Sequence, residues 1–178
     1  MTNDFKLLES ETEYGNVWYN AGYKLMRQPD GTKKKYYYVD MPNAVTIVPT
    51  IENRIVMVEE YRPVTDKTYV SCPTGVVEDG EQYVETANRE LVEETGYEAE
   101  VLNHVQSLDV ATGVLNHERG VVVAEGLHES DVQYKSDENE FIRVEEVEID
   151  DALEMVRERP TSSASIEALL LAKEDDFL

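Results

Sequence analysis

The chain has 178 residues, of which 41% are hydrophobic and 30% are charged, so it can bury a core as a single domain. Its 38 acidic and 16 basic residues give a net charge of -22, which repels nucleic acid and anionic membranes, and we expect neither as a partner. The first residues are acidic without an apolar run, and a single cysteine allows no internal disulfide, so we expect a cytoplasmic protein.

The first 80 residues predict β-structure. Strands are expected, from their aromatic and β-branched composition, at 5–13, 17–26, 35–39, 45–49, 54–61 and 69–71. The turn Pro29-Asp30-Gly31 joins the second and third of these as a hairpin, and Glu52-Asn53 joins the next two. Residues 73–80 are rich in Gly, Pro and acid, which predicts an irregular loop.

Residues 82–95 contain no Pro or Gly and predict a helix of about four turns. Asp79 can cap its start, and Gly96 can supply the left-handed residue past its end. The elements expected after it are strands at 98–108, 120–127 and 141–147, loops at 109–119 and 128–138, and helices at 151–159 and 163–173, split by Pro160. The predicted fold class is α+β, with a helix docked across the strands.

Acidic residues gather on one side of the predicted 82–95 helix. At 100° per residue, the carboxylate arc and the apolar arc consist of Glu90, Glu93 and Glu94, and of Val84, Ala87 and Leu91, respectively. No Lys or Arg lies one turn from all three acids, although Arg89 beside them can pair with Glu81 or Glu85. The carboxylates therefore predict a hard cation, and Mg²⁺ suits carboxylate and phosphate oxygens.

The spacing of residues 75–97 follows a recognisable motif. The pattern G-x5-E-x7-R-E-U-x-E-E-x-G-U, where U is a bulky apolar residue, is formed by Gly75, Glu81, Arg89, Glu90, Glu93, Glu94 and Gly96. It resembles the Nudix box of nucleoside diphosphate hydrolases, with Tyr97 where the motif usually has an aliphatic residue. The resemblance implies a Nudix fold: a mixed β-sheet sandwiched by helices, with an N-terminal antiparallel hairpin region. We expect one domain over 1–178, in which 1–42 contribute to a dimer and 43–178 form the core.

Four stretches outside the box resemble the ADP-ribose pyrophosphatase branch of that family: the aromatic hairpin with Pro-Asp-Gly, Glu-Glu-Tyr-Arg-Pro at 59–63, Pro-Thr-Gly at 73–75 and residues 138–144. This resemblance implies a Mg²⁺-dependent hydrolase of nucleoside diphosphate sugars, in which Mn²⁺ can substitute, built as a homodimer that exchanges its N-terminal strands. ADP-ribose, giving AMP and ribose 5-phosphate, is the first expected substrate. GDP-mannose or another nucleotide sugar is the alternative.

Two departures from the branch concern specificity and the loop. Ser71 stands where the branch has an acidic residue, and Thr112 stands near the position of a proline that often marks ADP-ribose specificity. A protein that senses a nucleotide sugar without cleaving it is a second hypothesis. That hypothesis predicts damaged box glutamates, whereas all three are present.

The resemblance also implies the residues that hold the metal and the substrate. The expected metal ligands are Glu90 and Glu94, with Glu93 and the carbonyl of Thr74 completing or sharing the sites, and Glu94 is also counted as catalytic. Gly75 lets the backbone come close to a ligand. The expected substrate contacts are Arg62 to the phosphates, as a planar fork, and Trp18 and Tyr36 stacked on the base.

A general base is expected outside the box, because the box glutamates are occupied as ligands. Glu140 is the first candidate and Glu138 the reserve, while Glu118 is the competing base or a substrate-binding residue. The three histidines, His104, His117 and His128, have no metal-ligand spacing.

Overall fold

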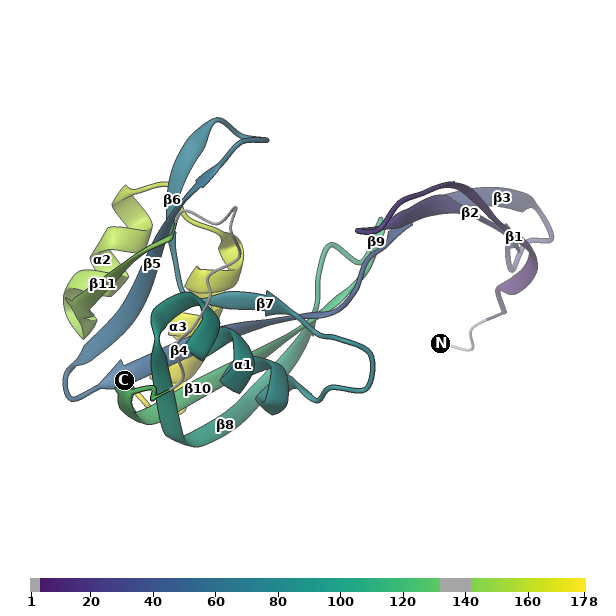
Figure 1. Ribbon diagram of the computed structural model, residues 1–178. Helices are drawn as coiled ribbons and strands as arrows, with labels where there is room; N and C mark the ends of the chain where they lie inside the picture. The colour runs from purple at the N-terminus through teal and green to yellow at the C-terminus, as the bar shows by residue number, and fades with distance from the viewer. Residues whose placement is uncertain (1–3, 132–141) are drawn as a thin grey trace. The chain divides into compact units, whose positions relative to one another are not determined.

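The computed structural model describes residues 4–131 and 142–178 (Figure 1). The strands within these residues are β1 Lys6–Gly15, β2 Asn20–Arg27, β3 Lys33–Asp40, β4 Ala44–Ile51, β5 Arg54–Arg62, β6 Lys67–Ser71, β7 Thr74–Val76, β8 Tyr97–Asp109, β9 Leu115–Asn116, β10 Glu118–Glu129 and β11 Ile142–Glu148. The helices are α1 Tyr83–Thr95, α2 Ile149–Glu158 and α3 Ser163–Glu174. The described chain divides into two compact units.

Unit 1 comprises Met1–Asn43 and Leu108–Arg119, and it is built on a four-stranded sheet in the order β1-β2-β3-β9. Strands β2 and β3 pair from Asn20 opposite Asp40 to Arg27 opposite Lys33, which confirms the predicted hairpin. Strand β1 lies at the sheet edge, also as predicted. The segment 109–119, expected to be a loop, contributes the short strand β9, which runs parallel to β3.

The expected strand at 17–26 is shorter than its composition suggests. The side-chain oxygen of Asn16 accepts hydrogen bonds from the backbone N–H groups of Trp18 and Tyr19, at 2.7 and 2.9 Å. This local bonding stabilises a turn at 16–19, because it offers the backbone an alternative to strand pairing. Strand β2 therefore begins only at Asn20.

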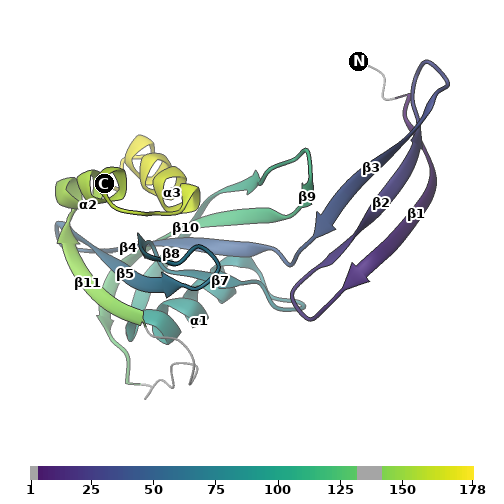
Figure 2. The ribbon, with the colours of Figure 1, turned by 90° about the horizontal axis from the view of Figure 1, so that it is seen from above.

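Unit 2 comprises Ala44–Ser107 and Gly120–Leu178 and holds a seven-stranded sheet. Its main order is β11-β5-β4-β10-β8, with β6 paired to β5 and β7 paired to β4. Helix α1 covers one face of this sheet, and α2 and α3 cover the other (Figure 2). The core beneath α1 is fully buried and consists of Val45, Ile47, Val56, Ala87, Leu91, Val122 and Ala124. The expected α+β architecture, with a β-sheet between helices, is confirmed.

The boundaries of α1 agree with the prediction, but its first cap differs. The N-cap is Gln82, whose backbone N–H donates to the carboxylate of Glu85 at 2.8 Å, so the cap expected at Asp79 is wrong. Gly96 ends the helix with φ of 75°, as predicted. None of the described helices is long and apolar enough to cross a membrane.

The segment 73–80, for which the sequence predicts an irregular loop, contains a short strand. Residues 74–76 form β7, in which Thr74 lies opposite Thr46 and Gly75 opposite Val45 of β4. The reason is that β4 presents backbone donors and acceptors there that need partners, and an extended Thr-Gly-Val stretch supplies them. This pairing holds the stretch before α1 at a fixed place on the sheet.

Candidate active site

The N-terminal half of the box contacts α1 through a very close backbone approach at Gly75. A Cβ atom at Gly75 would lie only 1.9 to 2.1 Å from the Cδ, Cγ and Oε1 atoms of Glu90. Next to it, the backbone N–H of Thr74 donates to Oε2 of Glu94 at 3.1 Å. Strand β7 thus brings Thr74 beside Glu94 and Gly75 beside Glu90. Three of the four expected metal ligands, Thr74, Glu90 and Glu94, therefore lie close to this strand.

Arg89 organises the acidic side of α1. One nitrogen, Nη1, donates to Glu90 at 2.7 Å and to Glu93 at 2.9 Å, while Nε and Nη2 donate to the two oxygens of Glu81 at 3.0 and 2.9 Å. The guanidinium also donates a hydrogen bond to the carbonyl of Val76, at 3.0 Å. The predicted pairing of Arg89 with Glu81 is therefore confirmed, and the same guanidinium also pairs with Glu90 and Glu93.

The pairing with Arg89 is electrostatically strong. The hydrogen bonds from the guanidinium hold the pKa of the Glu81 carboxyl at about 2, below its usual 4.5. In turn the carboxylates, Glu81 first, raise the pKa of Arg89. Glu81 therefore fixes the arginine, and the arginine places the carboxylates of Glu90 and Glu93 relative to one another.

The donor set fits a divalent cation in its chemistry. Carboxylates and a backbone carbonyl are the hard oxygen ligands that such cations prefer, and the missing side chain at Gly75 leaves room for the carboxylate of Glu90 against the β7 backbone. Among the described residues, no three acidic, His or Cys side chains surround a common point. The reason is visible in the contacts, since Arg89 holds Glu90 and Glu93 and Thr74 holds Glu94. A bound cation would attract the same carboxylates and so replace these hydrogen bonds from Arg89 and Thr74.

The expected phosphate contact, Arg62, lies at the end of β5. Its guanidinium is 2.7 Å from a carboxylate oxygen of Glu60, and its side chain is 51% exposed. In the antiparallel register, Glu60 lies opposite Ile142, the first residue of β11. Arg62 is therefore held by a neighbour on its own strand while keeping half of its surface accessible.

The two expected base-stacking residues belong to unit 1. Trp18 lies in the turn before β2 and is 70% exposed. Tyr36 lies in β3, where its hydroxyl accepts a hydrogen bond from Gln28 at 3.0 Å. Asp40 lies opposite Asn20, the first residue after the turn that holds Trp18, and Tyr36 lies opposite Lys24. Four strand residues, or roughly 13 Å, therefore separate Tyr36 from the end of the hairpin at which Trp18 lies. One chain does not bring these two rings together.

Of the three expected general bases, Glu140 and Glu138 lie outside the described residues. Glu118 begins β10 within unit 1, and its backbone N–H donates to the side chain of Asn43 at 3.0 Å.

Each histidine and the cysteine has a structural environment. His104 stacks on Tyr83 with ring centres 5.2 Å apart, buried His117 shares a hydrogen bond with the Pro42 carbonyl at 2.7 Å, and His128 lies 3.5 Å from Glu98. Burial raises the pKa of the Cys72 thiol to about 12, so this side chain is an unreactive part of the core.

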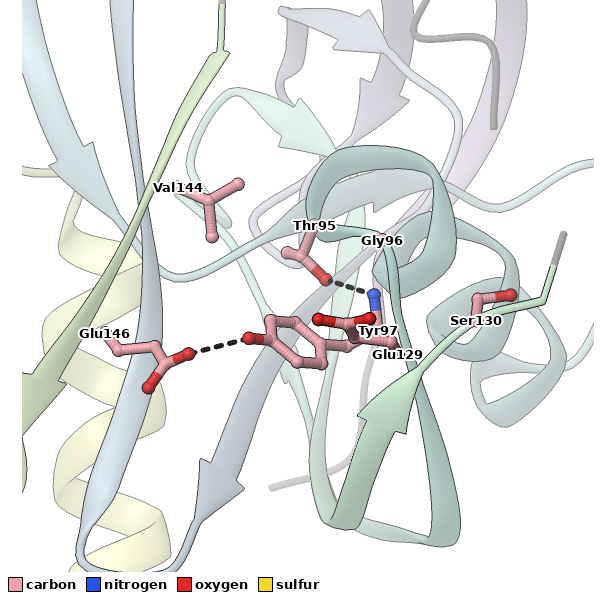
Figure 3. A pocket seen from close by; sticks show the side chains of 7 residues that line it. All are labelled: Thr95, Gly96, Tyr97, Glu129, Ser130, Val144 and Glu146. Atoms are coloured by element: carbon pink, nitrogen blue, oxygen red, sulfur yellow. Dashed lines mark hydrogen bonds between the residues drawn. The ribbon is translucent and has the colours of Figure 1, made fainter. Parts of the chain in front are cut away.

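A pocket of about 580 Å³ opens where α1 ends (Figure 3). Its lining residues are Thr95, Gly96, Tyr97, Glu129, Ser130, Val144 and Glu146. The ring of Tyr97 points across it, and the hydroxyl donates to Glu146 at 2.6 Å. Sequence reasoning missed this contact because 49 positions separate the two residues. The atypical Tyr97 in the box was the one available signal.

Comparisons with known proteins agree with this geometry. The family model described as NUDIX domain matches residues 40–169. A methanol dehydrogenase activator of Bacillus methanolicus is 39% identical over 132 residues, covering 74% of this chain and 71% of that protein. An ADP-ribose pyrophosphatase of Bacillus subtilis (strain 168) is 36% identical over 137 residues, covering 76% and 74%. A crystal structure of an ADP compounds hydrolase superposes with a TM-score of 0.85 at 24% identity, covering 96% of this chain and 92% of that one, and it supports the fold.

Proposed function

Because this chain belongs to the Nudix hydrolases, we propose that it cleaves the diphosphate bond of a nucleoside diphosphate sugar, and of ADP-ribose first, to AMP and ribose 5-phosphate. The proposal is supported by the contact between β7 and α1, where Gly75 leaves room for the side chain of Glu90 and the backbone N–H of Thr74 donates to Glu94. The name of the Bacillus subtilis relative supports ADP-ribose as the substrate. GDP-mannose or another nucleotide sugar is the alternative.

Nudix hydrolases use divalent metal ions, and Mg²⁺ is the ion that we propose here. The residues that would hold it are Glu90, Glu94, Glu93 and the carbonyl of Thr74. When bound, Mg²⁺ supplies positive charge beside the diphosphate, and Mn²⁺ can do the same. Glu81 and Arg89 hold Glu90 and Glu93 in place on the same side of α1.

The remaining roles fall to residues outside the box. Arg62 would bind the substrate phosphates through its planar fork, since half of its side chain is accessible. Glu140, with Glu138 as the reserve, would take the proton of the attacking water. Glu118 is the competing base or substrate-binding residue.

We also propose that the active protein is a homodimer in which unit 1 of each subunit contributes residues to the substrate site of the partner subunit. Unit 1 exposes many apolar and aromatic side chains, among them Leu7, Tyr14, Val17, Trp18 and Tyr37, each more than half exposed. Such surfaces mark protein interfaces. A dimer also offers a way for Trp18 and Tyr36 of different subunits to stack the two faces of one base.

The test is a substrate panel with a metal control. ADP-ribose, ADP-glucose, GDP-mannose, UDP-glucose and a dinucleoside polyphosphate are each incubated with the protein and Mg²⁺, and products are separated by anion-exchange chromatography. We expect AMP and ribose 5-phosphate from ADP-ribose, and no turnover with EDTA. Preferred cleavage of GDP-mannose would establish the alternative substrate. Binding of ADP-ribose without any product would establish the sensor hypothesis instead.

A further inference from the structure

Strands β5 and β6 form a hairpin that places a second positive charge beside Arg62. In the antiparallel register, Arg62 lies opposite Lys67, the first residue of β6. Directly opposed residues of a sheet point to the same face, with Cβ atoms roughly 5 Å apart. The exposed side chain of Lys67 therefore stands next to the guanidinium that we propose as a phosphate contact.

The two cations lie on the face of the sheet that α1 covers. Val56 of β5 belongs to the core beneath α1. Because side chains alternate between the faces along a strand, Arg62, six residues after Val56, points to this same face, and so does Lys67 opposite it. Both cations are thus on the side of unit 2 that carries the box glutamates.

The three acidic residues of the hairpin all have other partners. Glu59 and Glu60 are ion-paired with arginines. Asp66 accepts a hydrogen bond from the hydroxyl of Tyr61 at 2.7 Å, and this bond raises the pKa of Tyr61, so the hydroxyl keeps its proton. Within 4–131 and 142–178, no carboxylate forms an ion pair with Lys67.

The stability of the hairpin does not explain a lysine at this position. Like charges on directly opposed residues destabilise a strand pair. An anion that spans both side chains would remove the repulsion between Arg62 and Lys67. A diphosphate is such an anion, because its two neighbouring phosphates each carry a negative charge, and both guanidinium and ammonium groups bind phosphate oxygens.

We propose that Lys67 is a further substrate-binding residue, which holds the diphosphate of the nucleotide sugar together with Arg62. Glu60 keeps Arg62 in place, so the arginine offers a planar fork to one phosphate while Lys67 offers a point charge to the other. Tyr61 is a positioning residue, because its hydroxyl occupies the carboxylate of Asp66, which would otherwise attract the neighbouring ammonium group. The inference rests on the proposed function.

The first measurement is steady-state kinetics of Lys67→Ala with ADP-ribose. We expect KM to rise about 10-fold at low ionic strength and kcat to stay within about two-fold, because the contact exists in both the bound substrate and the transition state. The rise should shrink with added salt, which screens exposed charges. Lys67→Arg should restore most of the affinity. In urea denaturation, Lys67→Ala should be at least as stable as the wild type, because a like-charge pair is removed.

The matched control is Lys173→Ala, which removes one exposed positive charge from α3, on the other face of the sheet (Figure 2). This variant should keep the wild-type KM. An equal rise of KM in both variants would mean that only the net charge matters, and it overturns the inference. A KM of Lys67→Ala within about two-fold of the wild type also overturns it. Cleavage of ADP-ribose by the wild type would in both cases leave the proposed function standing.

The second measurement is a double-mutant cycle of Tyr61→Phe with Lys67→Ala. Tyr61→Phe removes only the hydroxyl and so frees the carboxylate of Asp66. We expect KM to rise about two- to three-fold in the wild-type background and to stay unchanged in the Lys67→Ala protein. An equal rise in both backgrounds overturns the role of Tyr61.

A different outcome of the substrate panel changes only the ligand used in these comparisons. If GDP-mannose is the preferred substrate, its KM is measured instead. If the protein binds ADP-ribose without cleaving it, the proposed function fails, and the same comparison of variants is made with the Kd. Neither cleavage nor binding of any panel member overturns both the proposed function and the inference.

Discussion

Gly75 owes its identity to a contact with another element. Its φ lies outside the left-handed region, so backbone freedom does not require a glycine there; the side chain of Glu90 fills the space that a Cβ would need. We expect Gly75→Ala to change the free energy of unfolding by less than about 1 kcal/mol, because the flexible carboxylate can move away. Turnover should nevertheless fall by at least about 10-fold, because Glu90 then leaves its place.

The matched control for this substitution is Gly113→Ala. A Cβ at Gly113 would meet no atom within 4 Å, and its φ lies outside the left-handed region. Chemical denaturation and turnover are measured for both variants. A Gly75→Ala protein as active as Gly113→Ala would show that the close approach of β7 to Glu90 has no part in catalysis.

Glu94 tests the proposed metal site most directly. Glu94→Gln keeps the size of the side chain and an oxygen that can accept from Thr74, but it removes the charge. We expect turnover at saturating Mg²⁺ to fall by about 100-fold or more, with an unchanged thermal midpoint. Glu85→Gln in the first turn of α1 is the control, since glutamine also serves in a capping box. Near-normal turnover of Glu94→Gln would refute the assignment.

The ion pair of Glu81 and Arg89 predicts a specific dependence of stability on pH. The folded pKa of Glu81, about 2, lies below the usual 4.5, so its contribution to stability is complete above pH 4.5 and disappears as the pH falls toward 2. The difference in unfolding free energy between wild type and Glu81→Gln should be constant from pH 7 to 5. Below pH 4.5 it should shrink by at most about 1.4 kcal/mol per pH unit. Urea titrations in EDTA measure it, and a constant difference down to pH 3 would contradict the pairing.

At the scale of elements, α1 depends on its buried face. Leu91 is fully buried between α1 and the sheet, whereas Leu170 of α3 is 50% exposed. We expect Leu91→Ala to lower the free energy of unfolding by about 2–5 kcal/mol and Leu170→Ala by less than about 1 kcal/mol. Urea denaturation of both variants provides the comparison. Equal losses would mean that the core does not lie beneath this face of α1.

Most elements could be predicted because their signals are local. The apolar and aromatic runs gave the strands, and the absence of Gly and Pro from 82–95 gave α1. The misses have a common cause, namely hydrogen bonds that composition does not reveal. The side chain of Asn16 stabilises a turn at Trp18, where the composition predicts a strand. Thr74 pairs with β4 as part of β7, and the hydrogen bond to Glu85 makes Gln82 the N-cap of α1.

The candidate site was predictable to the extent that its residues are close in sequence. The box places Glu90 and Glu94 one turn apart, and the arginine one turn before Glu93 could have revealed its pairing. The bond of Tyr97 to Glu146 depends on the folded sheet and leaves no trace in local spacing.

At the scale of the whole molecule, the proposed homodimer should be measurable directly. Sedimentation velocity at micromolar concentration should give the mass of two chains. Val17, 89% exposed in unit 1, is a suitable probe, and we expect Val17→Glu to shift the equilibrium toward monomers because a buried unpaired charge is costly. Leu170→Glu in unit 2 is the control. A monomeric wild type would contradict the dimer without affecting the proposed chemistry.

Unit 1 is assembled from two stretches that are far apart in the chain. The polypeptide crosses between the units at 43–44, 107–108 and 119–120, and β9 pairs with β3 while His117 bonds to Pro42. Residues 1–43 are therefore not self-contained, because the stretch 108–119 supplies the strand that pairs with β3 and the histidine that bonds to Pro42. A fragment that ended at residue 43 would leave β3 without β9, its neighbour on one side of the sheet.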